Sequence, residues 1–173
     1  MKPAPKYSAA QVAAAFVELV NEHGDFVSNL KLQKLLYYSQ GWNLAYKGEP
    51  LFPERLEAWV HGPVCPAVYH DFKRFGFKPI ELVVPSGTTP PELREHLEDI
   101  WRAYGALSGL DLEVLSHRES PWRNARGCTQ PTEHCARAIS HRDLWDFFSQ
   151  ECIKDGNQPA PTRALEDTAT AAR

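Results

Sequence analysis

The sequence predicts a mainly α fold: a compact helical domain that also holds a small antiparallel β element of two or three strands. Three observations lead to this prediction. Apolar residues recur at helical spacing along most of the chain, Ser or Pro opens many of these segments, and only two short segments have the apolar texture of strands. With 173 residues, of which 43% are hydrophobic, the chain can bury one core.

The first two helices are predicted over residues 9–22 and 29–46. Ser8 and Gln11 have the spacing of a capping box, in which each side chain satisfies a free amide at the helix start. Ser28 is a suitable N-cap for the second helix. Its apolar side chains are expected to face the core and its basic and phenolic side chains to share another side, which separates Leu32, Leu35, Leu36 and Trp42 from Lys31, Lys34 and Tyr38.

The middle of the chain is expected to hold the β element. Residues 56–60, which include Trp59, are predicted to form a short strand. Pro63 is interpreted as the start of a helix that runs to about Phe75, because proline suits the first helical position. Residues 80–84 lie between two prolines and are predicted to form a second strand that pairs with the first.

The C-terminal half is predicted to be helical. Thr89 and Glu92 repeat the capping-box spacing, and Pro90 would occupy the first helical position. Ser120 and Ser140 are suitable N-caps for later helices. These signals and the apolar spacing predict helices over about residues 90–107, 108–117, 120–126 and 141–153.

One ordered domain is expected over residues 8–153. Residues 1–7 are interpreted as a flexible arm. Residues 154–173 are rich in Asn, Gln, Pro, Thr and Ala, and they carry too little apolar surface to offset the entropy of an ordered chain. We therefore expect them to form a disordered tail.

Charge and hydropathy exclude two classes of function. The net charge is −3, from 19 basic and 22 acidic residues, whereas nonspecific nucleic-acid binding needs a large basic surplus. No apolar run is long enough to span a membrane. The apolar N-terminal segment is closed by Glu18, Glu22 and His23 without a clear cleavage pattern, so it is not interpreted as a signal peptide. A cytoplasmic protein is expected, with no membrane and no nucleic-acid partner.

Cys65 is the candidate nucleophile that the sequence offers. It lies near the predicted helix start, where a helix dipole can lower the pKa of a thiol, and His61 or His70 could act as its base. A reactive thiol also needs an oriented base, and no local sequence signature supports one. We therefore favour a structural Cys65 and expect no catalytic residue.

No metal or cofactor site is expected either. Cys128, His134, Cys135 and His141 fall in one short window, but their spacings lack the close ligand pairs that converge on zinc. No C-x-x-C pair and no glycine-rich phosphate loop occurs. Free, partly buried thiols are the expected state of the cysteines.

Two segments have the composition of a protein-binding surface. Lys31 and Lys34, with Tyr37 and Tyr38 beside them, supply too few phosphate contacts for nucleic acid, but they suit a protein interface. The alternative is that the tyrosines are core residues and the lysines are solvated. The second segment has the Trp and Arg composition of binding hot spots and consists of His117, Arg118, Glu119, Trp122, Arg123 and Arg126. Here the alternative is a core Trp122 beside a solvated Arg123.

Three segments together resemble the Panacea domain, the family of SocA-like and phage-associated GepA-like proteins. They read KLQKLLYYSQGW at residues 31–42, EAWVHGPV at 57–64 and SPWRNAR at 120–126. The resemblance covers about residues 10–150, so the predicted domain of residues 8–153 is Panacea-like. His61 stands where the family often has tyrosine.

The resemblance implies an antitoxin of a bacterial toxin–antitoxin system that binds its cognate toxin and has no enzymatic step. A SocA-like member acts as a proteolytic adaptor that hands its toxin to a ClpXP-type protease, and the composition of the tail favours that branch. The residues expected to bind the toxin are Lys31, Lys34, Tyr38, Trp59, His61, Trp122, Arg123 and Arg126.

Two alternatives come from other functional classes. A DNA-binding autoregulator of its own operon would need a clustered basic recognition helix, which this sequence lacks. A Cys-dependent hydrolase would need Cys65 as its nucleophile.

Overall fold

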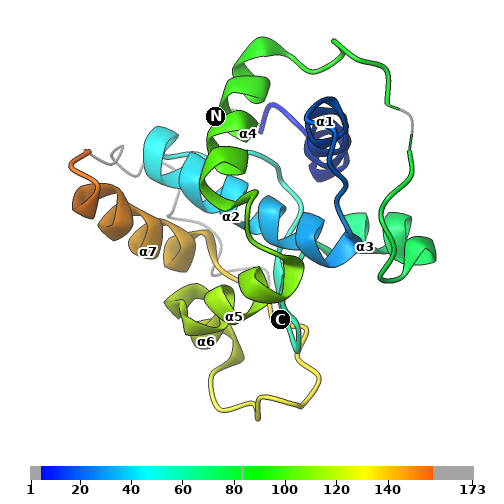
Figure 1. Cartoon of the computed structure of the whole chain (residues 1–173). Coiled ribbons are helices and arrows are strands. Elements are labelled where there is room, and N and C mark those ends of the chain that lie inside the picture. Colours follow the sequence, from blue (N-terminus) through cyan, green and yellow to red (C-terminus); the bar gives the residue numbers. More distant parts are fainter. Residues whose placement is uncertain (1–4, 83, 158–173) are drawn as a thin grey trace.

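The computed structural model describes residues 5–82 and 84–157, so the predicted arm and tail lie mostly outside the described residues. The described chain is mainly helical with one two-stranded sheet, which confirms the predicted fold class (Figure 1). Its elements are α1 (Ala9–Glu22), α2 (Asn29–Lys47), β1 (Glu57–Trp59), β2 (Gly62–Val64), α3 (Pro66–Phe72), η1 (Lys73–Phe75), α4 (Pro91–Tyr104), α5 (Gly109–Arg118), α6 (Ser120–Arg126) and α7 (His141–Lys154). Among the described residues, no helix is both long and apolar enough to cross a bilayer.

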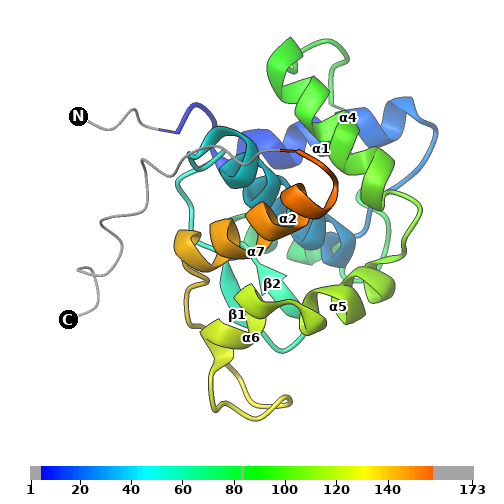
Figure 2. The same cartoon turned by 90° about the vertical axis from the view of Figure 1, so that its left-hand side faces the viewer.

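Helix α2 is the centre of the molecule. It packs against α1, α3, α4, α5, α7 and β2, and Figures 1 and 2 show it enclosed by them. Nearly all its residues are buried, including Lys34 and Tyr38. The predicted separation into a core face and a solvent face is therefore wrong, because other elements cover every side of this helix. A surrounded helix usually has apolar residues all round, whereas α2 also buries polar ones.

The helix starts of the N-terminal half follow the sequence signals. Ser8 and Gln11 form the predicted capping box at the start of α1, with the Ser8 amide 2.8 Å from the Gln11 carbonyl oxygen Oε1. The Ser28 hydroxyl accepts a hydrogen bond from the Lys31 amide at the start of α2. Helix α2 ends at Gly48, whose φ of 68° lies in the left-handed region that favours glycine. Both predicted helices are confirmed to within one residue at each end.

Strand β1 lies where the sequence predicts it, but its partner does not. β2 pairs antiparallel with β1, with Glu57 opposite Val64 and Trp59 opposite Gly62. Pro63 therefore lies in a strand, and the predicted helix start there is wrong. The next helix begins three residues later, at Pro66. Gly62 has a φ of 94°, which closes this tight hairpin and favours glycine.

The strand predicted at residues 80–84 is not found at residues 80–82 and 84, the part of this segment that the structure describes. The Ile80 amide instead donates to the Val27 carbonyl at 2.9 Å, which joins this segment to the connection between α1 and α2. The free edge of β1 bonds to the segment before α7, where the Ala58 amide donates to the Arg137 carbonyl at 3.0 Å. Strand composition alone does not decide which segments pair, and here tertiary packing does.

Helix α4 begins one residue later than predicted, with Pro90 as its N-cap, and ends at Tyr104 instead of near residue 107. Thr89 does not cap it, because its hydroxyl donates to the Glu18 carboxylate at 2.6 Å. Glu92 does not close a capping box either, because its carboxylate pairs with Lys6 and Lys47.

The remaining helices agree with the prediction more closely. Ser120 is the first residue of α6 and not its N-cap, a role that Glu119 fills. Ser140 caps α7 as predicted, with its hydroxyl 2.9 Å from the Asp143 amide. Helix α7 continues through Lys154, and residues 158–173 of the predicted tail lie outside the described residues.

Candidate protein-binding site

The β1–β2 hairpin carries predicted binding residues to the surface. The His61 side chain is 76% exposed, and its Nδ1 lies 3.1 Å from a carboxylate oxygen of Glu113 on α5. Trp59 is half-buried, packs edge-on against Tyr69 of α3 and donates its indole N–H to Glu57 at 2.7 Å. The hairpin therefore presents an aromatic ring and an imidazole in fixed positions.

Two side chains of α2 hold the hairpin from beneath. The Gln33 amide oxygen accepts a hydrogen bond from the Cys65 amide at 2.9 Å. The Lys34 ammonium nitrogen Nζ donates to the Pro63 carbonyl at 3.1 Å. A Cβ at Gly62 would lie 2.9 Å from that nitrogen, so the strand backbone passes directly over the lysine. The first half of the KLQKLLYY segment thus fixes the hairpin to the central helix.

Lys34 is fully buried, and burial lowers its pKa from 10.5 to about 7. Desolvation penalises the charged ammonium form, and the nearby Glu113 carboxylate only partly offsets this effect. Lys34 is a support for the hairpin and not a surface cation.

The second half of the KLQKLLYY segment binds the junction between α5 and α6. Tyr37 and Tyr38 donate their hydroxyl protons to the Glu119 carboxylate at 2.7 and 3.1 Å. Burial raises the pKa of Glu119 to about 7, although the two tyrosine hydrogen bonds oppose this shift. Tyr38 also stacks on Tyr104 of α4 at 3.9 Å between ring centroids. The two tyrosines therefore connect α2 to three other helices.

Helix α6 continues this support up to the hairpin. The Trp122 indole donates to the Trp59 carbonyl at 2.9 Å, and its ring stacks on His117 at 4.1 Å. Arg126 donates to the Ala58 carbonyl at 2.9 Å and to the Glu133 carbonyl at 2.8 Å. Both side chains are buried, and their polar atoms form hydrogen bonds within the protein.

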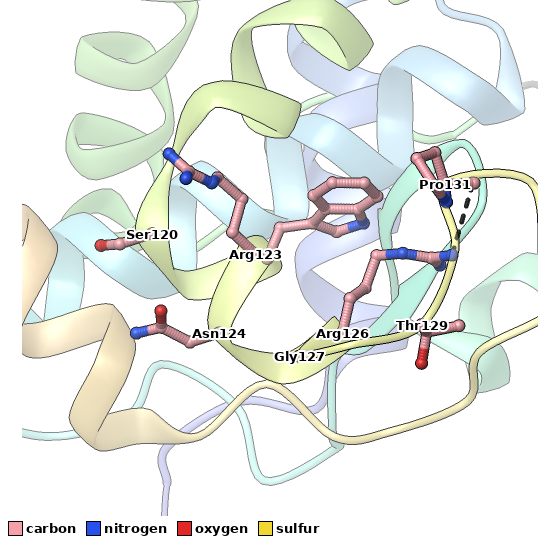
Figure 3. A pocket seen from close by; sticks show the side chains of 8 residues that line it. Ser120, Arg123, Asn124, Arg126, Gly127, Thr129 and Pro131 are labelled. Carbon is pink, nitrogen blue, oxygen red and sulfur yellow. Dashed lines mark hydrogen bonds between the residues drawn. The ribbon is translucent and has the colours of Figure 1, made fainter.

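A shallow cavity of about 420 Å³ lies over α6. Figure 3 shows that Arg126 points to the loop that carries Pro131, while Arg123 points away from it. The Arg123 side chain is exposed, and Asn124 donates to Asp143 of α7 at 2.8 Å. Arg123 is thus exposed and directed away from this loop, where it can meet a partner.

The structure divides the eight predicted binding residues into two groups. Lys34, Tyr38, Trp122 and Arg126 are buried, so their prediction as surface contacts is corrected: internal partners satisfy their polar atoms. The other four predicted residues are exposed or half-buried, and these are Lys31, Trp59, His61 and Arg123. The Lys31 ammonium group donates to the Gly105 carbonyl at 2.6 Å and lies over the Trp101 ring. The hairpin brings Trp59 and His61 together, whereas Lys31 and Arg123 do not line the same cavity.

Sequence reasoning missed a cavity of about 640 Å³ beside the hairpin, which we call the hairpin groove. Phe77 and Leu110 stand at its rim with 96% and 67% of their surface exposed. The residues that line the groove are Asn29, Leu30, Gln33, Trp59, Val60, His61, Val64, Tyr69, Lys73, Gly76, Phe77, Leu110, Glu113 and His134. One sequence signal was available: Phe77 is an apolar residue among glycine and lysines, where a core contact is not expected.

The candidate nucleophile lies in an environment that opposes its reactivity. Cys65 is buried, and burial raises the pKa of its thiol instead of lowering it. Because the thiolate is the reactive form, this environment favours an inert thiol. Residues 5–82 and 84–157 hold no group of three or more His, Cys, Asp or Glu side chains placed to bind a metal ion.

Comparison with known proteins agrees with the resemblance noted in the sequence. The family model described as "Antitoxin SocA-like, Panacea domain" matches residues 32–123. "Antitoxin SocA" of Caulobacter vibrioides (strain NA1000 / CB15N) is 38% identical over 109 residues, which cover 56% of this chain and 58% of that protein. The chain thus spans somewhat more than half of that relative. No solved structure matches. The chain belongs to the family of SocA-like antitoxins with a Panacea domain.

Proposed function

We propose that this protein is the antitoxin of a bacterial toxin–antitoxin system and that it neutralises its toxin by direct contact. The observation that carries the proposal is the match of residues 32–123 to the SocA-like antitoxin family, together with 38% identity to a protein named Antitoxin SocA. The matched region includes α2 from Leu32 onward, the hairpin and the start of α6, so it contains the hairpin and most of the side chains that hold it in place.

The hairpin face is the proposed toxin-binding surface. Trp59 and His61 provide its aromatic and imidazole side chains, and the exposed Arg123 on α6 is proposed as a separate basic contact. Hydrogen bonds from α2 and α6 fix the hairpin backbone at both strands. A surface that is already ordered loses less conformational entropy on binding, and this supports tight association without a catalytic group.

A direct experiment tests the proposal. The chain is co-expressed with the product of the adjacent gene, and growth and co-purification are measured. We expect growth rescue and a stable complex. Variant His61→Asp combined with Trp59→Ala should weaken both, whereas Phe26→Ala, at an exposed phenylalanine outside the hairpin, should not. Failure of the wild-type chain to rescue growth or to bind the neighbour would contradict the antitoxin function.

A finer version of the proposal is that the protein delivers its toxin to a ClpXP-type protease as an adaptor. It is supported by the similarity to SocA and by the resemblance of this chain to the SocA-like branch. The toxin half-life should shorten when the chain is present and lengthen again when ClpX is removed. A half-life that does not depend on the chain would leave occlusion of the toxin as the mechanism.

A further inference from the structure

The two amide side chains at the floor of the hairpin groove, those of Gln33 and Asn29, are already hydrogen-bonded within the protein. Gln33 accepts from the Cys65 amide at 2.9 Å and donates to the Asn29 carbonyl oxygen Oδ1 at 2.9 Å. Asn29 in turn donates to the Tyr69 carbonyl at 3.3 Å. A polar ligand would have to compete with these internal hydrogen bonds, so this floor favours an apolar occupant.

The walls and rim of the groove support the same conclusion. Trp59 and Tyr69 meet edge to face, with 4.9 Å between their ring centroids, and form an aromatic wall. Phe77 and Leu110 at the rim are 96% and 67% exposed. Full burial of such a side chain stabilises a complex by roughly 1.5–3 kcal/mol. An apolar side chain that enters the groove would cover these residues.

The rim beside Phe77 carries unpaired positive charge. Lys73 and Lys78 flank it in sequence, and neither forms an ion pair with a carboxylate among the described residues. Glu113 lines the opposite part of the groove, where its carboxylate lies 3.1 Å from the His61 imidazole. Beside Phe77, Lys73 lines the groove and Lys78 follows in sequence, so this side complements aspartate or glutamate.

We propose that the hairpin groove binds an apolar segment of the toxin that is flanked by acidic residues. The apolar side chain lies against Trp59 and Tyr69 under the rim formed by Phe77 and Leu110. The flanking carboxylates meet Lys73 and Lys78. Exposed ion pairs add little affinity, so these lysines mainly select the acidic sequence and set its register. This inference rests on the proposed antitoxin function.

The first test measures binding to the product of the adjacent gene. Phe77→Ser with Leu110→Ser should weaken the affinity about tenfold or more, because two apolar side chains that the toxin segment would cover are removed. Lys73→Glu with Lys78→Glu should weaken it and reduce its dependence on salt. The matched controls are Ile153→Ser and Lys154→Glu, which change exposed residues at the end of α7. Figure 1 shows α7 and α3 on opposite sides of the molecule. All these changes are at exposed positions, so folding is preserved.

The second test does not depend on the toxin. Random peptides displayed on phage are selected on the full chain, and the selected peptides are measured by fluorescence anisotropy. We expect an apolar residue flanked by Asp or Glu, and we expect binding to be lost in the Phe77→Ser, Leu110→Ser variant. Peptides with Lys in place of their acidic residues should bind the Lys73→Glu, Lys78→Glu variant better than they bind the wild-type chain.

The outcomes separate the two proposals. If the groove variants neutralise and bind the neighbouring gene product as the wild type does, the antitoxin function stands and the groove proposal is overturned. If the wild type does not bind that product, the antitoxin function fails and the peptide selection decides the groove. Peptides without acidic flanks, or peptides that bind the variants and the wild type equally, overturn the groove proposal.

Discussion

Replacing Lys34 by methionine should change how the stability of the protein depends on pH. The side chain is fully buried, and its pKa falls from 10.5 in the unfolded chain to about 7 in the folded one. Between these values the unfolded state binds more protons, so wild-type stability rises with pH. The Lys34→Met variant lacks this contribution. Its stability relative to the wild type should therefore decline as the pH rises from 7 to 9.

The size of this effect follows from the same pKa values. One pH unit corresponds to about 1.4 kcal/mol for each proton of difference. Lys34 in the folded state is about half protonated at pH 7 and almost neutral at pH 9. The wild type should then gain about 2 kcal/mol over Lys34→Met across this range.

Urea unfolding at pH 7, 8 and 9, followed by tryptophan fluorescence, measures the difference. Lys154→Met is the matched control, because its side chain is 67% exposed. Its stability relative to the wild type should change little with pH. If the unfolding free energies of Lys34→Met and the wild type differ by the same amount at all three pH values, the lowered pKa of a buried Lys34 is refuted.

Four further predictions test the buried contacts of α2 and α6 and the exposure of the cysteines. The folded state raises the pKa of Glu119 to about 7, so the wild type loses stability as this carboxyl group ionises between pH 5 and 7. The unfolding free energy of Glu119→Gln should therefore rise relative to that of the wild type by about 2 kcal/mol over this range. Gly41→Ala should lower the unfolding free energy by about 1–3 kcal/mol, because its Cβ would lie 2.1 Å from the Phe148 ring. Arg126→Met should lower the unfolding free energy by about 3 kcal/mol, because the carbonyls of Ala58 and Glu133 lose their donor. Denaturant titration measures the effects of Gly41→Ala and Arg126→Met. Cys128 is exposed and should react with a thiol reagent faster than the three buried cysteines, as mass spectrometry of the labelled chain would report.

Each of these four has an outcome that would contradict it. A pH-independent difference for Glu119→Gln would mean that its carboxylate is solvated. An unchanged midpoint for Gly41→Ala would mean that Phe148 does not pack on α2 as described. If Arg126→Met is as stable as the wild type, the hydrogen bond from Arg126 to β1 does not stabilise the fold. Equal labelling of all four cysteines would contradict their burial.

The starts of α1, α2 and α7 were predictable because their signals are local. Ser8, Ser28 and Ser140 accept hydrogen bonds from amides three residues ahead, and the chain needs no distant partner for this. The pairing of strands is not local. The segment at 80–84 has strand composition, yet it bonds to the connection between α1 and α2, and the strand that pairs with β1 contains Pro63.

The candidate site was predictable only in outline. The segments at residues 31–42, 57–64 and 120–126, which carry the family resemblance, meet in the structure. The roles within them did not follow from residue type. Lys34 and Arg126 have the composition of a binding surface, but both are buried with backbone carbonyls as partners, which depends on elements far away in sequence. Helical periodicity treats a lysine as a surface residue and cannot detect such a partner.

Hydrogen exchange of the chain alone and in the presence of the adjacent gene product tests the central claim most directly. The claim is that the hairpin and its groove form the toxin-binding surface. The expected result is added protection in residues 57–64, 73–78 and 109–114, with α7 unchanged. Protection confined to α7 or α4, or no change in any segment when the two proteins are mixed, would contradict the claim.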